Sequence, residues 1–192
     1  MGISVVINTL NEESNLRDCI CSINGFAEEV LVCDMYSEDR TVDTAISLGA
    51  RVIYHQKTGY VEPARKYAIS AAENEWVLVL DADERCTESI KQKLLEISQS
   101  NNFDLVKFGI LYNYFGKYIK RGGFYNTNFP RFFRKTYYLE TYNESETISH
   151  NNFRSMEKGN GRILQLEEHY YLIHEAYPSV EKYVVKTIGH YA

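Results

Sequence analysis

Short apolar runs alternate with amphipathic segments along the first half of the chain, and this alternation constrains the fold more than any other feature. The apolar runs, rich in Val, Ile and Leu as buried strands are, lie at residues 3–8, 28–34, 51–55 and 75–81. Apolar residues recur at helical spacing in the segments between them, 11–23, 37–49 and 62–74. Strands that alternate with helices of this length imply crossover connections. The sequence therefore predicts an α/β fold, a mostly parallel Rossmann-like sheet with helices on both faces.

The second half of the chain is less regular. After a helix expected near residues 88–99, the stretch 103–116 is typical of a strand or a hairpin. With 192 residues and 44% hydrophobic content, one domain is the default, and we expect a smaller α+β region from about residue 101 that continues the sheet. The helical pattern of residues 178–191 stops abruptly, so we expect a chain that is truncated at its C-terminus.

Composition excludes several classes of protein. No run approaches the roughly 18 apolar residues that a membrane span needs, and residues 1–7 lack the features of a signal peptide. We therefore expect a cytoplasmic protein with reduced core thiols at Cys19, Cys21, Cys33 and Cys86. The formal net charge of −5 argues against a general nucleic-acid binder, whose affinity comes from neutralising phosphates.

Polar residues follow the predicted strands at the points where they end, and ligands of open α/β sheets bind beyond these carboxyl ends. These residues are Asn8, Thr9, Asn11, Asp34, Asp81 and Asp83. Asp81 and Asp83 could together hold a hard divalent cation if the chain turns between them. Alternatively, Asp81 caps the helix that begins near Thr87. Asp34 likewise has two interpretations, a hydrogen-bond acceptor for a nucleobase or ribose, or part of a turn before the next helix.

Three blocks of the sequence together resemble the family 2 glycosyltransferases, which have the GT-A fold and usually use nucleotide-sugar donors. The blocks are SVVINTLNEESNLRDCICSI, EEVLVCDMYSEDRTVDTAISLGARV and ARKYAISAAENEWVLVLDADE. Their order and spacing match the family from about residue 3 to residue 84. The resemblance implies a nucleotide-sugar-binding half at residues 1–100 and an acceptor-binding, catalytic half at 101–192.

The resemblance also implies roles for individual residues. Asp34 is expected to recognise the uracil, Arg65 to contact the nucleotide or the diphosphate, and Asp81 to lie by the ribose. Asp83 is expected to ligate Mn²⁺ or Mg²⁺ between the diphosphate oxygens. The first nucleotide-contacting loop would contain Thr9, Asn11 and Glu12. The chain departs from the family at Lys66, where Asn is usual.

A glycosyltransferase that inverts the anomeric centre needs a base that deprotonates the acceptor. The stretch RFFRKTYYLETYNESETISH resembles a subgroup that includes lipopolysaccharide-core β-glucosyltransferases and bacteriocin peptide glycosyltransferases. On that alignment Glu144 takes the position of the base, and Glu146 is a substitute. Asn143 stands where His is usual.

Residues further along the chain could complete the site. His169 is expected to approach the metal or the diphosphate, although a structural role is equally open; His174 carries no motif and is expected to be structural. Arg131 and Arg134, in a basic aromatic stretch, are expected to face the diphosphate or an anionic acceptor. The aromatic residues expected to stack on sugar faces are Trp76, Tyr112 and Phe124.

We therefore expect a metal-dependent, inverting hexosyltransferase of cell-envelope glycan synthesis that uses Mn²⁺ or Mg²⁺. We expect its donor to be a nucleotide-diphosphate sugar that is linked to UDP. Glycan, lipid-linked and peptide acceptors all remain open. The alternatives are a peptide or protein glycosyltransferase and a catalytically inactive nucleotide-sugar-binding module. A dinucleotide oxidoreductase is disfavoured because no G-x-G-x-x-G follows the first strand. The six cations of residues 116–135 also allow peripheral contact with the inner face of a membrane.

Overall fold

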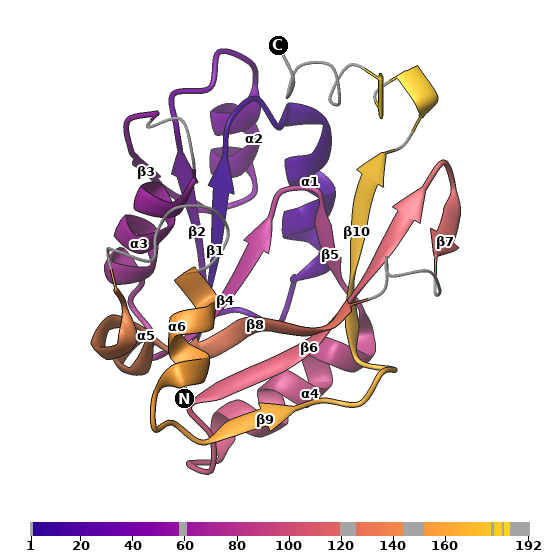
Figure 1. Ribbon diagram of the computed structural model, residues 1–192. Helices are drawn as coiled ribbons and strands as arrows, with labels where there is room; N and C mark the ends of the chain where they lie inside the picture. Colours follow the sequence, from indigo (N-terminus) through magenta and orange to yellow (C-terminus); the bar gives the residue numbers. More distant parts are fainter. Residues whose placement is uncertain are drawn as a thin grey trace.

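The computed structural model describes residues 2–57, 61–119, 126–143, 152–177, 179–181 and 183–184 (Figure 1). Its helices are α1 (Glu13–Ser22), α2 (Thr41–Ser47), α3 (Glu62–Ala71), α4 (Glu88–Gln99), α5 (Lys135–Thr141) and α6 (Asn152–Lys158). Among the described residues, no helix is both long and apolar enough to cross a lipid bilayer.

The described strands join one mixed sheet. They are β1 (Ile3–Thr9), β2 (Glu29–Asp34), β3 (Arg51–Tyr54), β4 (Trp76–Asp81), β5 (Glu84–Cys86), β6 (Leu105–Tyr114), β7 (Lys117–Ile119), β8 (Asn126–Arg134), β9 (Ile163–Gln165) and β10 (Tyr171–Tyr177). Their order is β3-β2-β1-β4-β8-β6-β10-β5, and β7 and β9 also pair with β6. Strands β3, β2, β1 and β4 are mutually parallel. The predicted α/β fold with a parallel first half is therefore confirmed.

Helices cover both faces of the sheet, because alternate residues of the buried strands point to opposite sides. Ile3, Val5 and Ile7 of β1 pack in one core cluster with apolar residues of α1, α2 and α4. Val6 packs in a second cluster with α3, α5 and α6. The continuous apolar run of β1 is thus the signature of a strand that is covered on both sides.

Strand β8 joins the two halves of the chain, and Figure 1 shows it crossing the molecule between β4 and β6. It pairs antiparallel with both, so that Phe132 lies opposite Leu78 of β4 and Val106 of β6. The expected region beyond residue 101 therefore continues the sheet. The residues after Arg134 then form α5, which packs against the same face as α3.

The chain turns directly after β4 and enters the short strand β5, which the sequence did not predict. β5 pairs antiparallel with β10, far away in the sequence. Helix α4 begins two residues after β5, and the side chain of Thr87 caps it by accepting a hydrogen bond from the Ile90 N–H at 3.4 Å. The interpretation of Asp81 as the cap of this helix is therefore wrong.

The single tryptophan belongs to the core. Trp76 is fully buried, and its ring stacks on Phe132 with the centroids 4.5 Å apart and the planes 9° from parallel. The Arg134 guanidinium lies 4.7 Å from the centre of the Trp76 ring. Trp76 therefore has no surface on which a sugar could stack, and the expectation that it does so is wrong.

Glu29, the first residue of β2, ties the amino-terminal ends of three strands to the end of α3. Its Oε1 accepts from Nε of Arg51 at 3.0 Å and from Nη2 of Arg51 at 2.5 Å. Its Oε2 accepts from the Ser4 hydroxyl and from the Glu73 N–H, the latter at 2.7 Å. Burial alone would raise the pKa of Glu29, but these hydrogen bonds outweigh it and lower the pKa below its usual value.

We expect Glu29→Gln to lower the free energy of unfolding by about 1–3 kcal/mol at pH 7, because it weakens charge-assisted bonds to buried donors. A lowered folded-state pKa contributes stability above the unfolded-state pKa, about 4.5, and this contribution is lost as the pH falls through the folded-state value. The difference between wild type and variant should therefore shrink below about pH 4.5. Urea unfolding at several pH values measures it.

The matched control is Glu96→Gln. Glu96 pairs with Lys93 at the surface of α4, where ion pairs contribute little. Equal effects of the two substitutions, or a Glu29→Gln effect that does not change with pH, would contradict this account.

Candidate functional site

A cavity of about 570 Å³ lies beyond the carboxyl ends of β1 and β4. These strands pair in parallel up to Asn8 and Asp81, so the residues that follow both meet at one edge of the sheet. The charged and polar residues that line the cavity are Asn8, Glu12, Arg65, Asp81, Asp83, Glu84, Tyr112, Arg131 and His174. The cavity thus combines residues from the first half of the chain with residues of β6, β8 and β10.

The carboxylate of Asp81 lies between two arginines. Nη2 of Arg65, on α3, donates to Oδ1 at 2.9 Å, and Nη2 of Arg131, on β8, donates to Oδ2 at 3.0 Å. Burial alone would raise the pKa of Asp81, but the positive charges of Arg131 and Arg65 lower it well below its usual value. The ring of Phe153 lies 5.4 Å from the Arg65 guanidinium and 5.8 Å from that of Arg131. Asp81 is therefore held ionised, with its charge offset on both sides.

Glu84 shapes the turn that carries the acidic residues. Its fully buried side chain folds back, so that Oε2 accepts from the Asp81 N–H at 2.9 Å and Oε1 from Nη2 of Arg131 at 3.2 Å. Burial raises the pKa of Glu84 above its usual range, although Arg131 acts in the opposite direction. Glu84 is not among the site residues expected from the sequence, because no pattern shows that this side chain points back into its own turn.

Asp83 meets His174 at the same cavity. Nε2 of His174 lies 3.1 Å from Oδ2 of Asp83, and the Asp83 carbonyl accepts from the Glu175 N–H at 2.8 Å. Burial alone would lower the pKa of His174, but the contact with Asp83 outweighs it and raises the pKa. The pairing of β10 with β5, which sets His174 opposite Glu84, produces this contact. The sequence predicts a structural role for His174, because the residue carries no motif. The long-range pairing of β10 with β5 instead brings His174 to Asp83.

Asp83 and His174 offer an oxygen and a nitrogen that suit a divalent cation. Among the described residues, no group of three or more His, Cys, Asp or Glu side chains forms a ready metal cluster. Mn²⁺ and Mg²⁺ often keep only one or two protein ligands and share the rest of their coordination with phosphates and water. The two residues therefore fit an ion that a bound diphosphate would share.

Three residues that line the cavity carry buried polar atoms without a hydrogen-bond partner in the described part of the chain. These atoms are Nε of Arg65, Nη1 of Arg131 and both amide atoms of Asn8. Buried donors without partners are costly, and native proteins keep few of them. Two of the three belong to guanidinium groups, which match phosphate oxygens in charge and geometry. An anionic ligand with several oxygens would satisfy the two guanidinium donors and the amide nitrogen of Asn8.

The predicted nucleotide loop forms a polar network beside the cavity. Asp34 is fully buried, and its carboxylate accepts from the Thr9 hydroxyl at 3.1 Å and from the Ser37 N–H at 2.8 Å. Asn11, with a φ of 56°, donates from its N–H to the Ser37 hydroxyl at 2.8 Å. Glu12 lines the cavity itself. Thr9, Asn11 and Asp34 are thus brought together, and direct recognition of a nucleobase by Asp34 stays a prediction.

Arg134 lies away from the cavity. Because β8 runs antiparallel to β4, Arg134 is opposite Trp76 at the start of β4, whereas the cavity lies at the other end. Its Nε donates to the Phe103 carbonyl at 3.1 Å, and its Nη2 donates to Oδ1 of Asn101 at 2.9 Å. Of Arg131 and Arg134, which were both expected to face the diphosphate or an anionic acceptor, the structure brings only Arg131 to Asp81.

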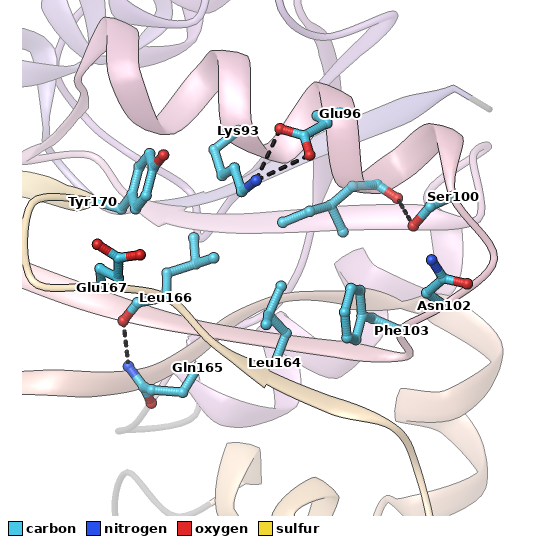
Figure 2. Close-up of a pocket in the computed structure, with 11 residues that line it drawn as sticks. Lys93, Glu96, Ser100, Asn102, Phe103, Leu164, Gln165, Leu166, Glu167 and Tyr170 are labelled. Atoms are coloured by element: carbon cyan, nitrogen blue, oxygen red, sulfur yellow. Dashed lines mark hydrogen bonds and ion pairs between the residues drawn. The ribbon is translucent and has the colours of Figure 1, made fainter.

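His169 is also remote from Asp83. It is 59% exposed and lies 3.5 Å from Glu167. It lines a cavity of about 250 Å³ on the surface of α4. Figure 2 shows the neighbouring pocket of about 440 Å³ between α4 and the segment that contains β9. Lys93 and Glu96 pair with each other there at 2.9 Å. None of the described residues that line these two cavities has a buried polar side-chain atom without a partner.

Other expected site residues lie outside the described residues. They are Glu144 and Glu146, the two candidate bases, and Phe124. Tyr112 does line the cavity, as expected for a residue that stacks on a sugar.

Comparison with known sequences identifies the family. The model of glycosyl transferase family 2 matches residues 4–158. An uncharacterized glycosyltransferase of Rickettsia bellii is 37% identical over 102 residues, which cover 53% of this chain and 34% of that protein. The low-salt glycan biosynthesis hexosyltransferase Agl6 of Haloferax volcanii is 35% identical over 111 residues, covering 54% of this chain and 26% of that protein. The matches with Rickettsia proteins thus span about a third of their length.

Solved structures show the same fold. S. aureus TarS 1-349 in complex with UDP matches with a TM-score of 0.68 at 21% identity, over 95% of this chain and 62% of that chain. Its complex with UDP-GlcNAc gives a TM-score of 0.69 at 19% identity, over 91% and 59%. The family match covers most of the chain, and the structural match extends to nearly all of it. The chain therefore belongs to glycosyl transferase family 2 and has the GT-A fold that the sequence predicted.

Proposed function

We propose that the cavity binds a UDP-linked hexose and that the chain carries the donor site of an inverting, metal-dependent glycosyltransferase of cell-envelope glycan synthesis. The observation that carries this proposal is a set of guanidinium donors on Arg65 and Arg131 that have no partner among the described residues and lie next to Asp83 and His174 in one cavity. A diphosphate would supply oxygens for these guanidinium donors, and a divalent cation would bind the carboxylate of Asp83 and the imidazole of His174.

The relatives support the choice of donor. Agl6 is described as a hexosyltransferase of glycan biosynthesis, and TarS binds UDP and UDP-GlcNAc. The resemblance of the Asp34 segment to a uracil-binding turn points to the same class of nucleotide. A glycan, a lipid-linked sugar or a peptide side chain would be the acceptor, at the cytoplasmic side of the membrane.

The proposed reaction is a single displacement. The acceptor hydroxyl oxygen forms a bond with C1 of the donor sugar while the bond from C1 to the phosphate oxygen breaks. UDP leaves with the electron pair, and the hydroxyl proton passes to Glu144. Arg65 and Arg131 would bind the diphosphate and stabilise the charge that develops on it. Mn²⁺ or Mg²⁺, held by Asp83 with His174, would supply further positive charge to the leaving group.

We expect Asp83→Asn to weaken Mn²⁺-dependent binding of UDP by about 10- to 100-fold, because a neutral amide is a poor ligand for a hard cation. Titration calorimetry with UDP, with and without Mn²⁺, measures the effect. Asp43→Asn, at an exposed position of α2, is the matched control and should change nothing. Equal Mn²⁺-dependent affinities in wild type and Asp83→Asn would contradict the metal assignment.

A second pair of variants separates binding from folding. Arg131→Met should lower stability by about 3–5 kcal/mol, because it leaves the buried Glu84 and the neighbouring Asp81 without their shared cation. Arg131→Met/Glu84→Gln should regain much of this stability, since fewer buried charges are left unpaired. UDP affinity should stay low in both proteins.

Chemical unfolding and UDP titration on the same samples give the two readouts. Recovery of both stability and UDP affinity in the double variant would show that Arg131 serves only the fold. Loss of neither in the single variant would contradict the described ion pairs.

The base is tested by Glu144→Gln beside Glu146→Gln. We expect Glu144→Gln to retain UDP binding and to lower UDP release from UDP-glucose by about 10²- to 10⁴-fold, because general-base catalysis contributes that much. Glu146→Gln should leave the rate close to that of wild type. The reverse pattern would assign the base to Glu146. Metal-dependent UDP binding without release or transfer in wild type would identify a nucleotide-sugar-binding module instead of an enzyme.

A further inference from the structure

A row of aromatic rings extends from the cavity to the tip of the β6–β7 hairpin. We call Tyr112, Tyr114, Tyr177, Tyr183 and Phe115 the aromatic row. Ring centroids are 6.2 Å apart for Tyr112 and Tyr114, 5.3 Å for Tyr114 and Tyr177, and 4.8 Å for Tyr177 and Tyr183. The inner end lies in the proposed donor site, because Tyr112 lines the cavity and its ring is 4.9 Å from that of His174. The row is therefore continuous with the site.

Strand pairing explains why these rings lie together. Tyr112 and Tyr114 are two residues apart on β6, so they point to the same face of the sheet. β10 runs parallel to β6, beside it in Figure 1, and sets His174 opposite Tyr112 and Tyr177 opposite Tyr114. Tyr183 belongs to the short helical turn that follows, where its N–H donates to the Ser179 carbonyl at 3.1 Å. Two strands and a turn thus contribute to one surface.

Phe115 occupies a backbone position that is unfavourable for it. It has a φ of 54°, Gly116 has a φ of 78°, and Tyr114 pairs with Lys117 across this two-residue turn. Such turns favour Asn or Asp followed by Gly, and a bulky residue in this conformation costs free energy. The ring nevertheless stays 44% exposed and meets Tyr183 edge-on at 6.1 Å. An exposed, strained aromatic residue is a sign of function rather than of packing.

The chemistry of the row fits a carbohydrate. Each tyrosine presents an apolar ring together with a hydroxyl group, as binding surfaces for amphipathic ligands do. A pyranose has apolar C–H faces that stack on rings and hydroxyl groups that exchange hydrogen bonds. The spacing of neighbouring rings, 4.8–6.4 Å, is comparable to the length of one hexose unit. A lipid chain would instead be matched by an aliphatic groove.

We propose that the aromatic row is the acceptor platform and that it binds a carbohydrate chain, whose end reaches the donor cavity at Tyr112. This inference rests on the proposed function, because it assigns the acceptor of that same site. It selects a glycan from the three acceptor classes that the sequence leaves open. The chain would lie along β6 and β10, with successive sugars over Tyr112, Tyr114 with Tyr177, and Phe115 with Tyr183.

The test measures carbohydrate binding without requiring turnover. Maltohexaose, cellohexaose and chitohexaose are titrated into wild-type protein and into Tyr114→Ala, Tyr183→Ala and Phe115→Asn, with saturation-transfer NMR as the readout. We expect at least one of the oligosaccharides to bind wild type, and each substitution to weaken that binding by about 3- to 10-fold. Leu139→Ala, at an exposed position of α5, is the control and should bind like wild type.

Phe115→Asn separates function from stability. Asn suits the turn better than Phe, so the midpoint of thermal unfolding should stay the same or rise while carbohydrate binding falls. A merely structural ring would give the opposite result, with a lower midpoint and unchanged binding.

UDP binding on the same samples distinguishes failure of the two proposals. If no UDP binds in the presence of Mn²⁺, the proposed function fails, whatever the oligosaccharides do. If UDP binds but no oligosaccharide does, or if ring removal leaves oligosaccharide binding unchanged, the acceptor platform fails and the donor site stands. Two further results would overturn the acceptor platform. One is binding of an unstructured Ser- and Cys-rich peptide, but of no oligosaccharide, that is lost when the rings are removed. The other is dimerisation of the protein that is lost in the same variants.

Discussion

The contact on which the rest of the site depends is the carboxylate of Asp81 between Arg65 and Arg131. It joins α3, β4 and β8, which come from distant parts of the chain, at the edge where the parallel strands end. Two guanidinium groups this close would repel each other in a partly buried cavity without the acid between them. Asp81 therefore makes it possible to hold two guanidinium groups in place before any ligand arrives, and in our proposal this lowers the cost of organising the site when a diphosphate binds.

The two acids of the D-A-D stretch have separate roles, because the chain turns between them. Asp81 faces the arginines and Asp83 faces His174, while Glu84 holds the turn through the Asp81 N–H. The repulsion between neighbouring carboxylates is thus relieved by protein cations on one side. The other side depends on His174 and, in our proposal, on a divalent ion.

Local patterns predicted much of the fold and part of the site. Strands β1 to β4 and helix α4 could be read directly, because each is a continuous apolar run or a periodic segment with clear ends. The family resemblance predicts Arg65 at the nucleotide or the diphosphate, and the basic aromatic stretch predicts Arg131 at the diphosphate or an anionic acceptor. Both lie at the cavity, whereas Arg134, three residues after Arg131, lies at the far end of β4.

What could not be read depends on pairings between distant segments. His174 reaches Asp83 only because β10 pairs with β5, and a single sequence carries no signal for that register. His169, five residues earlier, precedes the strand and lies on the surface of α4. The insertion of β8 between β4 and β6 was equally invisible, and it is what buries Trp76 against Phe132.

The insertion of β8 between β4 and β6 limits where this chain can be cut into fragments that fold. Strand β4, which leads into the acidic turn, and strand β8, which supplies Arg131, are paired directly in one hydrogen-bonded sheet. A fragment that ended at residue 100 would expose the open edge of β4 and the face of Trp76, a template for association with other chains. The two halves of this chain therefore cannot be exchanged independently, because a graft of the first half would have to include β8.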